Sequence, residues 1–423
     1  MATLEKAVVK GLAEDKGLYM PENIKPLPKE FFDNIDNMSF QEIAYTVADA
    51  FFGEDVDAES LKKIVYDTLA FDCPVVPVSE NIYTLELFHG PTLAFKDVGA
   101  RFMARLLQYF LKKENNGSEV NVLVATSGDT GSAVANGFLG VDGIKVYVLY
   151  PKGKVSPIQE CQFTTLGKNI TAIEVDGVFD DCQALVKSAF MDTDLNAHMK
   201  LTSANSINVA RFLPQAFYYF YAYAQMKKQG KADQMVMCVP SGNFGNICAA
   251  LFGHRMGLPI KRFVAANNAN DIFYNYLQTG KYNPQPSKAT LANAMDVGDP
   301  SNFARIYDLY KGDHKAITSL ISGATYKDEQ IRETMRQCHK ETGYVLDPHG
   351  ACGYQALKDL LQPGEYGVFC ETAHPAKFKE KVDDILSTEI EIPARLQAFM
   401  KGTKQSVEMS KDFADFKAYL LKQ

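Results

Sequence analysis

A chain of 423 residues is long for one hydrophobic core, so the length predicts two or more packed units. Hydrophobic residues make up 46% and charged residues 22% of the chain, which excludes an intrinsically disordered protein. The 44 basic and 51 acidic residues give a net charge of −7, so the composition argues against a nucleic-acid partner.

The cysteines and the apolar runs indicate where the protein works. The eight cysteines are scattered without a CxxC pair, so their spacing predicts no metal site and no disulfide framework. Reduced thiols and an N-terminus without the apolar core of a secretory signal predict a cytoplasmic protein. We expect no membrane span, because no run of eighteen apolar residues occurs.

In chain order, residues 1 to about 75 are predicted to be mostly helical, with an amphipathic helix over Phe40 to Gly53. Strands and helices then alternate. The predicted strands are VNVLVATSG from Val120, IKVYVLYP, NITAIEV, MVMCVPSGN from Met235, RFVAANNAN from Arg262 and, as the last one, YGVFCET from Tyr366. Helices are predicted at 129–140, 157–165 and 180–191.

This alternation predicts an α/β fold with two open, mostly parallel sheets covered by helices, and an extra, mostly helical N-terminal domain. The spacing places one sheet within roughly Val98 to Ala204 and the other in the rest of the chain. We therefore expect a helical domain at 1–75, a large α/β domain at 76–97 and 205–390, a small α/β domain at 98–204, and a C-terminal helical segment at 391–423.

Three predicted strands run into loops rich in Gly, Ser, Thr and Asn: ATSGDTG, PSGNFGN and ETAHP. Ligands of open α/β sheets bind beyond the carboxyl ends of the strands, so we expect the three loops to share one cleft. PSGNFGN, Pro240 to Asn246, stands between a strand and a helix, where backbone amides and the helix dipole suit a phosphate. A purely structural turn is the alternative. No GK[ST] or GxGxxG pattern is present, so a nucleotide-binding protein is disfavoured.

The loop ATSGDTGSA, Ala125 to Ala133, has the same strand–loop–helix context. Its three hydroxyls, on Thr126, Ser127 and Thr130, suit a carboxylate ligand. Asp129 is open to a simpler interpretation, because an aspartate at this place is also a typical N-cap of the following helix.

Lys96 lies in an apolar stretch at the start of an amphipathic helix, within HGPTLAFKDVGARFMARLL. Desolvation there favours the neutral amine that imine formation requires. The alternative is a structural lysine that extends its amine to solvent and pairs with Asp97.

Seven segments between residues 10 and 379 carry a family resemblance: GLAEDKGLYMPE, HGPTLAFKD, ATSGDTGSA, SANSINVAR, PSGNFGN, LDPHGACGY and ETAHPAKF. In this order they resemble the threonine synthase family, which are fold-type-II pyridoxal phosphate (PLP) enzymes related to tryptophan synthase β. The resemblance implies a PLP lyase, a monomer or homodimer, in which the large α/β domain binds PLP. The implied reaction converts O-phospho-L-homoserine and water to L-threonine and phosphate, by γ-elimination followed by β-addition of water.

The resemblance also implies roles for single residues. Lys96 matches the catalytic lysine that carries PLP as a Schiff base. Thr372 matches a hydroxyl that keeps the pyridine nitrogen of PLP uncharged. The other implied cofactor contacts are Phe95, Asp129, Gly242, Asn243, Phe244, Gly245 and Asn246. Asp129 stands where related branches have Asn beside the phenolic oxygen, and this leaves its role open.

Two further loops would hold the substrate. Thr126, Ser127 and Thr130 match the loop that binds its carboxylate, and Asn205, Ser206, Asn208 and Arg211 match the segment that binds its phosphate. If Asn208 to Tyr221 forms a helix, Arg211 lies one turn in, on the same face as Asn208. Without the family, Arg211 is interpreted as a surface charge.

Three alternative functions remain open. SANSINVAR speaks against a threonine or serine dehydratase, which needs no second anion site. Lys96, Thr372 and the intact glycine loop speak against a non-catalytic phosphate-binding relative. A nucleotide-binding α/β protein lacks its fingerprint.

Overall fold

The computed structural model describes residues 1–115 and 117–423, which form two compact units. The first unit comprises Met1–Tyr19, Lys96–Arg211 and Ile392–Gln423, and the second comprises Met20–Phe95 and Phe212–Glu391. The first 75 residues are mostly helical, as predicted, and they contribute to both units. The domain boundaries given from the sequence stay a prediction.

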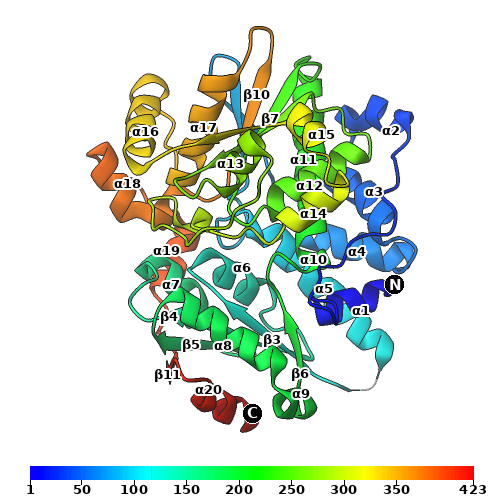
Figure 1. The fold of residues 1–423 in the computed structure, drawn as a ribbon, viewed down its shortest axis with the longest axis vertical. Helices are drawn as coiled ribbons and strands as arrows, with labels where there is room; N and C mark the ends of the chain where they lie inside the picture. Colours follow the sequence, from blue (N-terminus) through cyan, green and yellow to red (C-terminus); the bar gives the residue numbers. More distant parts are fainter. Residues whose placement is uncertain (116) are drawn as a thin grey trace. The chain divides into compact units, whose positions relative to one another are not determined.

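The first unit is built on a five-stranded sheet in the order β11-β5-β4-β3-β6, in which every neighbouring pair is parallel (Figure 1). Its strands are β3 (Val120–Ala125), β4 (Ile144–Pro151), β5 (Ile170–Asp176), β6 (Lys200–Ser203) and β11 (Val407–Ser410). Its helices are α1 (Leu4–Lys10), α5 (Lys96–Glu114), α6 (Asp129–Gly137), α7 (Pro157–Thr164), α8 (Phe179–Met191), α9 (Thr193–His198), α19 (Ala394–Met400) and α20 (Phe413–Leu421). The chain passes from the first unit to the second within α10 (Val209–Phe212).

The strands of this sheet form because their side chains are buried on both faces. All six residues of β3 are buried, which is the reason its sequence is a continuous apolar run broken only by Asn121. One core cluster combines residues of β3, β4 and β5 with apolar residues of α8 and α20. Local chemistry sets the helix boundaries: Ser156 caps α7 through its hydroxyl, and Pro157 follows as the first helical residue.

The second unit contains a six-stranded sheet in the order β1-β2-β10-β7-β8-β9, in which only β1 and β2 are antiparallel. Its strands are β1 (Val75–Ser79), β2 (Ile82–Glu86), β7 (Met235–Pro240), β8 (Arg262–Asn267), β9 (Ile321–Thr325) and β10 (Tyr366–Glu371). Its α-helices are α2 (Lys29–Asn34), α3 (Phe40–Phe52), α4 (Ala58–Thr68), α11 (Ala216–Lys228), α12 (Gly245–Arg255), α13 (Ile272–Thr279), α14 (Phe303–Leu309), α15 (His314–Leu320), α16 (Asp328–Thr342), α17 (Pro348–Leu360) and α18 (Lys379–Leu386). Short 3₁₀ turns are η1 (Ile35–Asn37), η2 (Leu213–Gln215), η3 (Asn293–Met295) and η4 (Pro375–Phe378).

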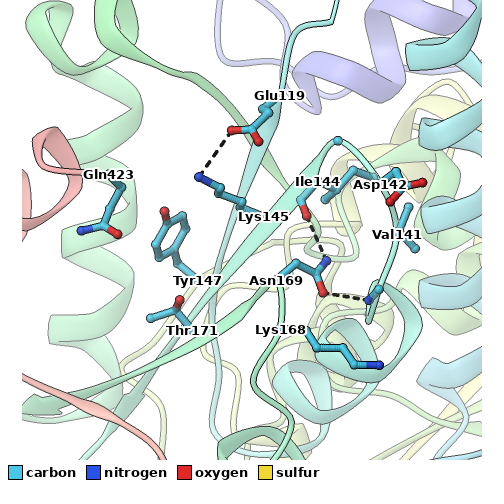
Figure 2. Close-up of a pocket in the computed structure, with 12 residues that line it drawn as sticks. Glu119, Val141, Asp142, Ile144, Lys145, Tyr147, Lys168, Asn169, Thr171 and Gln423 are labelled. Carbon is cyan, nitrogen blue, oxygen red and sulfur yellow. Dashed lines mark hydrogen bonds and ion pairs between the residues drawn. The ribbon is translucent and has the colours of Figure 1, made fainter.

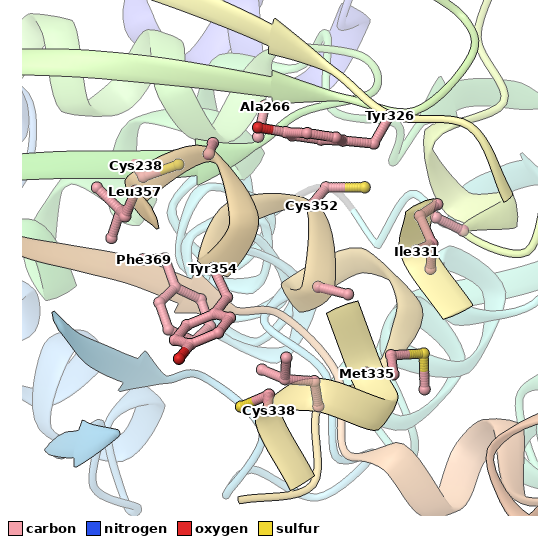
Figure 3. Close-up of a cluster of buried hydrophobic side chains, with 14 of the residues drawn as sticks. Cys238, Ala266, Tyr326, Ile331, Met335, Cys338, Cys352, Tyr354, Leu357 and Phe369 are labelled. Carbon is pink, nitrogen blue, oxygen red and sulfur yellow. The ribbon is translucent and has the colours of Figure 1, made fainter. Parts of the chain in front are cut away.

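One face of the second sheet packs on α16 and α17 (Figure 3). The cluster includes Cys238 and Phe369 from the strands together with Met335, Cys338 and Leu357 from the two helices. The amphipathic helix predicted at Phe40 to Gly53 is α3, which begins with a capping box between Ser39 and Glu42. These observations confirm the predicted fold class.

Two predictions about elements were wrong. YGVFCET is β10, but it is not the last strand, because β11 pairs with β5 at the edge of the first sheet. Residues 208–221 do not form one helix: α10 ends at Phe212, the turn η2 contains Pro214, and α11 starts at Ala216. Proline lacks the N–H that a continuous helix would use, and this interrupts the hydrogen-bond ladder.

The loops expected to bind ligands follow the carboxyl ends of β3, β7 and β10. Strands β7 and β10 are hydrogen-bonded neighbours in the second sheet, so PSGNFGN and ETAHP begin at the same edge of that sheet. The loop ATSGDTG belongs to the first unit. That all three loops share one cleft stays a prediction.

Candidate functional site

Lys96 is the first residue of α5 and is half-buried. Its amine donates a hydrogen bond of 2.7 Å to the hydroxyl of Thr130, in the first turn of α6. Thr130 was predicted to bind the substrate carboxylate, and this stays a prediction; in the structure its hydroxyl lies next to the lysine. An amine fixed to a hydroxyl at this distance has a defined direction, which general acid–base chemistry requires.

The segment before Lys96 is fastened to the segment after β10. The N–H of Phe95 donates to the carbonyl of Thr372 at 2.7 Å, and the N–H of His374 donates to the carbonyl of Leu93 at 3.0 Å. Leu93 has a φ of 61°, which is rare for a branched residue and marks a constrained turn. Since Lys96 follows Phe95 directly, these bonds hold the backbone of the residue that precedes the lysine.

Thr372 is buried, and its hydroxyl has no partner among the described residues. A buried hydroxyl is normally hydrogen-bonded, so one at the end of a strand is a candidate ligand group. The neighbouring imidazole of His374 is neutral, because burial, helped by His89, lowers its pKa to about 4. From the sequence, Thr372 was predicted to lie at the pyridine nitrogen of PLP. The buried hydroxyl of Thr372 and the neutral imidazole of His374 fit an uncharged pyridine nitrogen.

The loop PSGNFGN leads from β7 into α12, as predicted. Phe244 is buried and has a φ of 66°, a left-handed conformation that a phenylalanine seldom adopts. No side chain caps α12. The first turn of this eleven-residue helix therefore presents its amides to any anion at that end, and the donor set suits a phosphate.

Two asparagines hold this loop in shape. The amide of Asn246 donates to the carbonyl of Pro240 at 2.9 Å and accepts from the N–H of Ile247 at 2.8 Å. The side-chain oxygen of Asn243 accepts from the N–H of Ser301 at 2.7 Å. A Cβ on Gly242 would lie 2.8 Å from the Cα of Met295, so the loop is pressed against a neighbouring segment at this glycine.

The loop ATSGDTGSA is organised by Thr126 rather than by Asp129. The hydroxyl of Thr126 is buried and accepts from the N–H groups of Gly128 at 2.9 Å and Gly131 at 2.8 Å. The N-cap of α6 is Gly128, so the interpretation of Asp129 as the cap was wrong. The buried carboxylate of Asp129 accepts instead from the amide of Gln159 at 3.1 Å.

In the segment SANSINVAR, Ser203 to Arg211, the side chain of Asn208 is completely buried and hydrogen-bonded to the backbone. Its amide donates to the carbonyls of Val8 at 2.9 Å and Ser203 at 3.2 Å, and its oxygen accepts from the N–H of Ala210 at 3.0 Å. Asn205 and Ser206 are only half-buried. The structure therefore places Asn208 under the loop, where it shapes the turn that carries Asn205 and Ser206.

Arg211 is 2% exposed, so its interpretation as a surface charge was wrong. Its guanidinium donates to the carbonyl of Ala204, at the opposite end of the same loop. Burial lowers the pKa of Arg211 to about 10, against the opposing effect of the buried Asp97. At neutral pH the guanidinium is still charged, and a desolvated cation of this kind is suited to pair with an anion.

Sequence reasoning missed a group of buried acids at the carboxyl end of β10. Glu371 lies beside Asp347, and the hydroxyl of Tyr344 donates to Glu86 at 2.7 Å. Burial raises the pKa of Glu371 well above its usual range, and the Asp347 and Glu86 carboxylates raise it further. Burial also opposes ionisation of Asp347, but His349 and nearby donors keep the pKa of Asp347 low. The motif LDPHGACGY was the signal in the sequence, and no role was assigned to it.

A separate pocket of about 490 Å³ lies in the first unit, at the amino ends of the strands (Figure 2). Lys145 reaches Glu119 at 3.4 Å on one side of it, and Asn169 bridges Gly140 and Ile144 on the other. None of the residues predicted for cofactor or substrate lines this pocket. Ligand sites of parallel sheets lie at the carboxyl ends of strands, so the pocket is not the candidate site.

Within residues 1–115 and 117–423, no group of three or more His, Cys, Asp or Glu side chains is arranged to hold a metal ion. Over the same residues, every helix is too short or too polar to cross a membrane.

Comparison with known proteins defines the class. Residues 72–368 match the family model of pyridoxal-phosphate dependent enzymes, residues 1–69 match that of the threonine synthase N terminus, and residues 350–420 match that of the threonine synthase C-terminal region. With its two mostly parallel sheets, the chain has the fold of a type II PLP enzyme, and its cofactor is PLP.

The relatives narrow this class. The chain is 46% identical to threonine synthase of Haemophilus influenzae, over 99% of this chain and 97% of the relative. The crystal structure of threonine synthase from Escherichia coli superposes with a TM-score of 0.92 at 43% identity, covering 100% of this chain and 97% of the other. The structure of PLP-bound threonine synthase from Brucella melitensis superposes with a TM-score of 0.93 at 33% identity, covering 99% of this chain and 96% of the other. The chain belongs to the threonine synthase family.

Proposed function

We propose that this chain converts O-phospho-L-homoserine and water to L-threonine and inorganic phosphate, with PLP as its cofactor. Family membership supports the reaction. The observation that carries the choice of substrate is the buried guanidinium of Arg211, which gives SANSINVAR the anion-binding character that a phosphorylated substrate needs. A dehydratase acting on serine or threonine has no second anion to bind.

The residues present fit PLP. Lys96 would carry it through the amine, with Phe95 beside it, and Thr372 would face the pyridine nitrogen with a neutral hydroxyl. The uncapped first turn of α12 and the glycine loop, Gly242 to Asn246, would hold its phosphate. Asp129, tied to Gln159, stays the proposed neighbour of the phenolic oxygen. When bound, PLP stabilises the negative charge that develops on the substrate carbon beside the amino group.

Lys96 would then move the protons. Its amine takes a proton from Cα and one from Cβ, the phosphate leaves Cγ with the bonding electron pair, and Cγ receives a proton. Water adds its hydroxyl at Cβ and gives its remaining proton to the released phosphate. Cα is then protonated again, so threonine and phosphate balance the substrate and one water. The hydroxyl of Thr130, 2.7 Å from the amine, orients the lysine during these transfers.

The remaining side chains would hold the substrate. Ser127 and the amides of the ATSGDTG turn, whose shape Thr126 fixes, would bind the carboxylate. Asn205, Ser206 and Arg211 would bind the phosphate, and Asn208 would support them from below. We also propose that the protein is cytoplasmic. We propose that it is a monomer or homodimer, and light scattering on the purified chain would test this oligomeric state.

The decisive experiment incubates the purified chain with PLP and O-phospho-L-homoserine and measures phosphate and threonine together. We expect equal amounts of both, and neither product with Lys96→Ala. A 2-oxo acid formed from serine or threonine, without phosphate release from the phosphorylated substrate, would show that a dehydratase was the better assignment.

A further inference from the structure

The LDPHG segment contains a hydrogen-bonded chain that begins at Asp347, the N-cap of α17. One carboxylate oxygen of Asp347 accepts from the N–H of Gly350 at 2.8 Å, and the other lies 2.5 Å from Nδ1 of His349. Both side chains are buried, with Asp347 at 0% and His349 at 2% exposure. Capping alone would need only the aspartate, so the contact with the imidazole requires a separate explanation.

The other nitrogen of His349 determines which tautomer is present. Nε2 lies 3.1 Å from the backbone nitrogen of Ala294, whose N–H can only donate. Nε2 must therefore accept, so the ring proton is on Nδ1, which donates to Asp347. His349 is thus a neutral bridge between α17 and the turn η3.

The turn η3 is the segment against which the glycine loop is pressed. A Cβ on Gly242 would lie 2.9 Å from the carbonyl oxygen of Ala294 and 2.8 Å from the Cα of Met295. Asn268, the residue after β8, holds the same segment, since its amide donates to the carbonyl of Ala292 at 3.0 Å and to Asp296 at 2.9 Å. The Ala294 peptide thus sets how far Gly242 can move.

We propose that His349 is a positioning residue for the phosphate-binding loop of the cofactor. It acts from Asp347 through the Ala294 N–H onto Gly242, and it touches neither the cofactor nor the substrate. The inference rests on the proposed assignment of Gly242 to Asn246 to the cofactor phosphate. If His349 holds η3 in place, it affects ligands that carry a phosphate and leaves phosphate-free ligands unaffected.

Two substitutions test the two hydrogen bonds of the His349 imidazole one at a time. His349→Asn keeps an amide N–H near the position of Nδ1 for Asp347 but presents nothing to Ala294. His349→Gln places an amide oxygen near the position of Nε2 and can still accept from Ala294. The full-length chain, freed of cofactor, is titrated with PLP and with pyridoxal, which lacks the phosphate, and thermal unfolding is recorded for each variant.

We expect His349→Asn to raise the dissociation constant of PLP about tenfold, the effect of about one unmade buried hydrogen bond. Its pyridoxal binding should be unchanged, and His349→Gln should bind both ligands like the parent. The proposal would be overturned if His349→Asn lost affinity for PLP and pyridoxal equally, or if His349→Gln bound PLP as weakly as His349→Asn. If the parent chain itself does not prefer PLP over pyridoxal, the assignment of the glycine loop fails instead.

A measurement on the unmodified protein covers the case in which His349→Asn does not fold. The ¹⁵N spectrum of the seven histidines, with His349 identified by its absence in His349→Gln, should show this ring as the neutral Nδ1–H tautomer at pH 7. An Nε2–H tautomer or an imidazolium would exclude the bond from Ala294, and with it the proposal. The ³¹P resonance of bound PLP should coincide between the parent and His349→Gln, and a folded His349→Asn should shift it.

Discussion

Glu371→Gln replaces one oxygen of a buried carboxyl at the end of β10 by an amide nitrogen, and it removes one titrating proton from the folded protein. The carboxyl of Glu371 is 0% exposed and lies against Gly350, where an added Cβ would be 2.5 Å from either oxygen. Burial, together with the Asp347 and Glu86 carboxylates, holds the pKa of Glu371 well above its ordinary 4.5. In the folded protein near pH 6 this side chain is therefore a neutral acid, and glutamine imitates it closely.

The sign of the effect on stability follows from the proton count. Near pH 6 the unfolded chain ionises Glu371, while the folded chain keeps the proton, so folding takes up one proton. The free energy of unfolding then falls by about 1.4 kcal/mol for each pH unit of increase between the unfolded and the folded pKa. Asp347, with its lowered pKa, is ionised in both states in this range and contributes no slope. Glu371→Gln removes the slope, so the variant gains stability relative to the parent as pH rises.

Glu365→Gln is the matched control, a second buried glutamate of the same unit whose pKa moves in the opposite direction. Hydrogen bonds from Arg262, against the effect of burial and with help from Gln362 and Lys261, lower the pKa of Glu365 from 4.5 to about 2. That difference corresponds to about 3 kcal/mol of stability, present above pH 4.5 and lost as pH falls toward 2. From pH 5.5 to 6.5 this control should lower stability by a constant amount.

Urea unfolding followed by circular dichroism, at pH 5.5 and 6.5, measures all three proteins. Between the two pH values the free energy of unfolding should change by the same amount in the parent and in Glu365→Gln. The free energy of unfolding of Glu371→Gln, relative to that of the parent, should rise by about 1.4 kcal/mol over this one pH unit. Parallel lines for the parent and Glu371→Gln would mean that Glu371 is ionised in the folded protein, and the reasoning about this acid cluster would be refuted.

Substitutions at three further positions test the site. Thr130→Val removes the hydroxyl bonded to Lys96, so kcat/KM should fall about tenfold, the effect of one buried hydrogen bond, while Thr130→Ser restores it. Gly242→Ala adds a Cβ against η3, so we expect a weaker affinity for PLP in titration and a loss of about 1–3 kcal/mol in urea unfolding. Gly99→Ala places a Cβ on the carbonyl of Arg211, so KM for the phosphorylated substrate should rise without a change in PLP affinity, and an unchanged KM would contradict the role of that loop.

The central strands could be predicted because buried parallel strands have a local signature. VNVLVA of β3 and MVMCVP of β7 are apolar runs that end in glycine-rich loops. The strand β11 could not be found in this way. Its four residues, VEMS, alternate apolar and polar, and only the pairing with β5, more than two hundred positions earlier in the chain, makes them a strand.

The break in the predicted helix at 208–221 was visible in the sequence, since Pro214 stands in its interior. Arg211 is a different case. An arginine near the start of a helix is exposed by default, and its burial depends on long-range packing with α5, where Gly99 leaves room for the Arg211 carbonyl. For the same reason Asp129 was mistaken for a cap: its partner Gln159 lies thirty residues away.

The two loops proposed to bind anions are built in the same way but would bind them by different means. In each, one buried asparagine, Asn246 or Asn208, is bonded to the backbone and gives the loop its shape. The glycine loop offers neutral amides and a helix dipole, which would hold a phosphate without burying a formal charge. SANSINVAR instead buries the full charge of Arg211, and this desolvation is unfavourable to the folded chain by itself, as the lowered pKa shows. A phosphate ester on the substrate would offset that cost, and a substrate without one would not, so under the proposed assignment the buried charge that weakens this loop would also select the phosphorylated substrate.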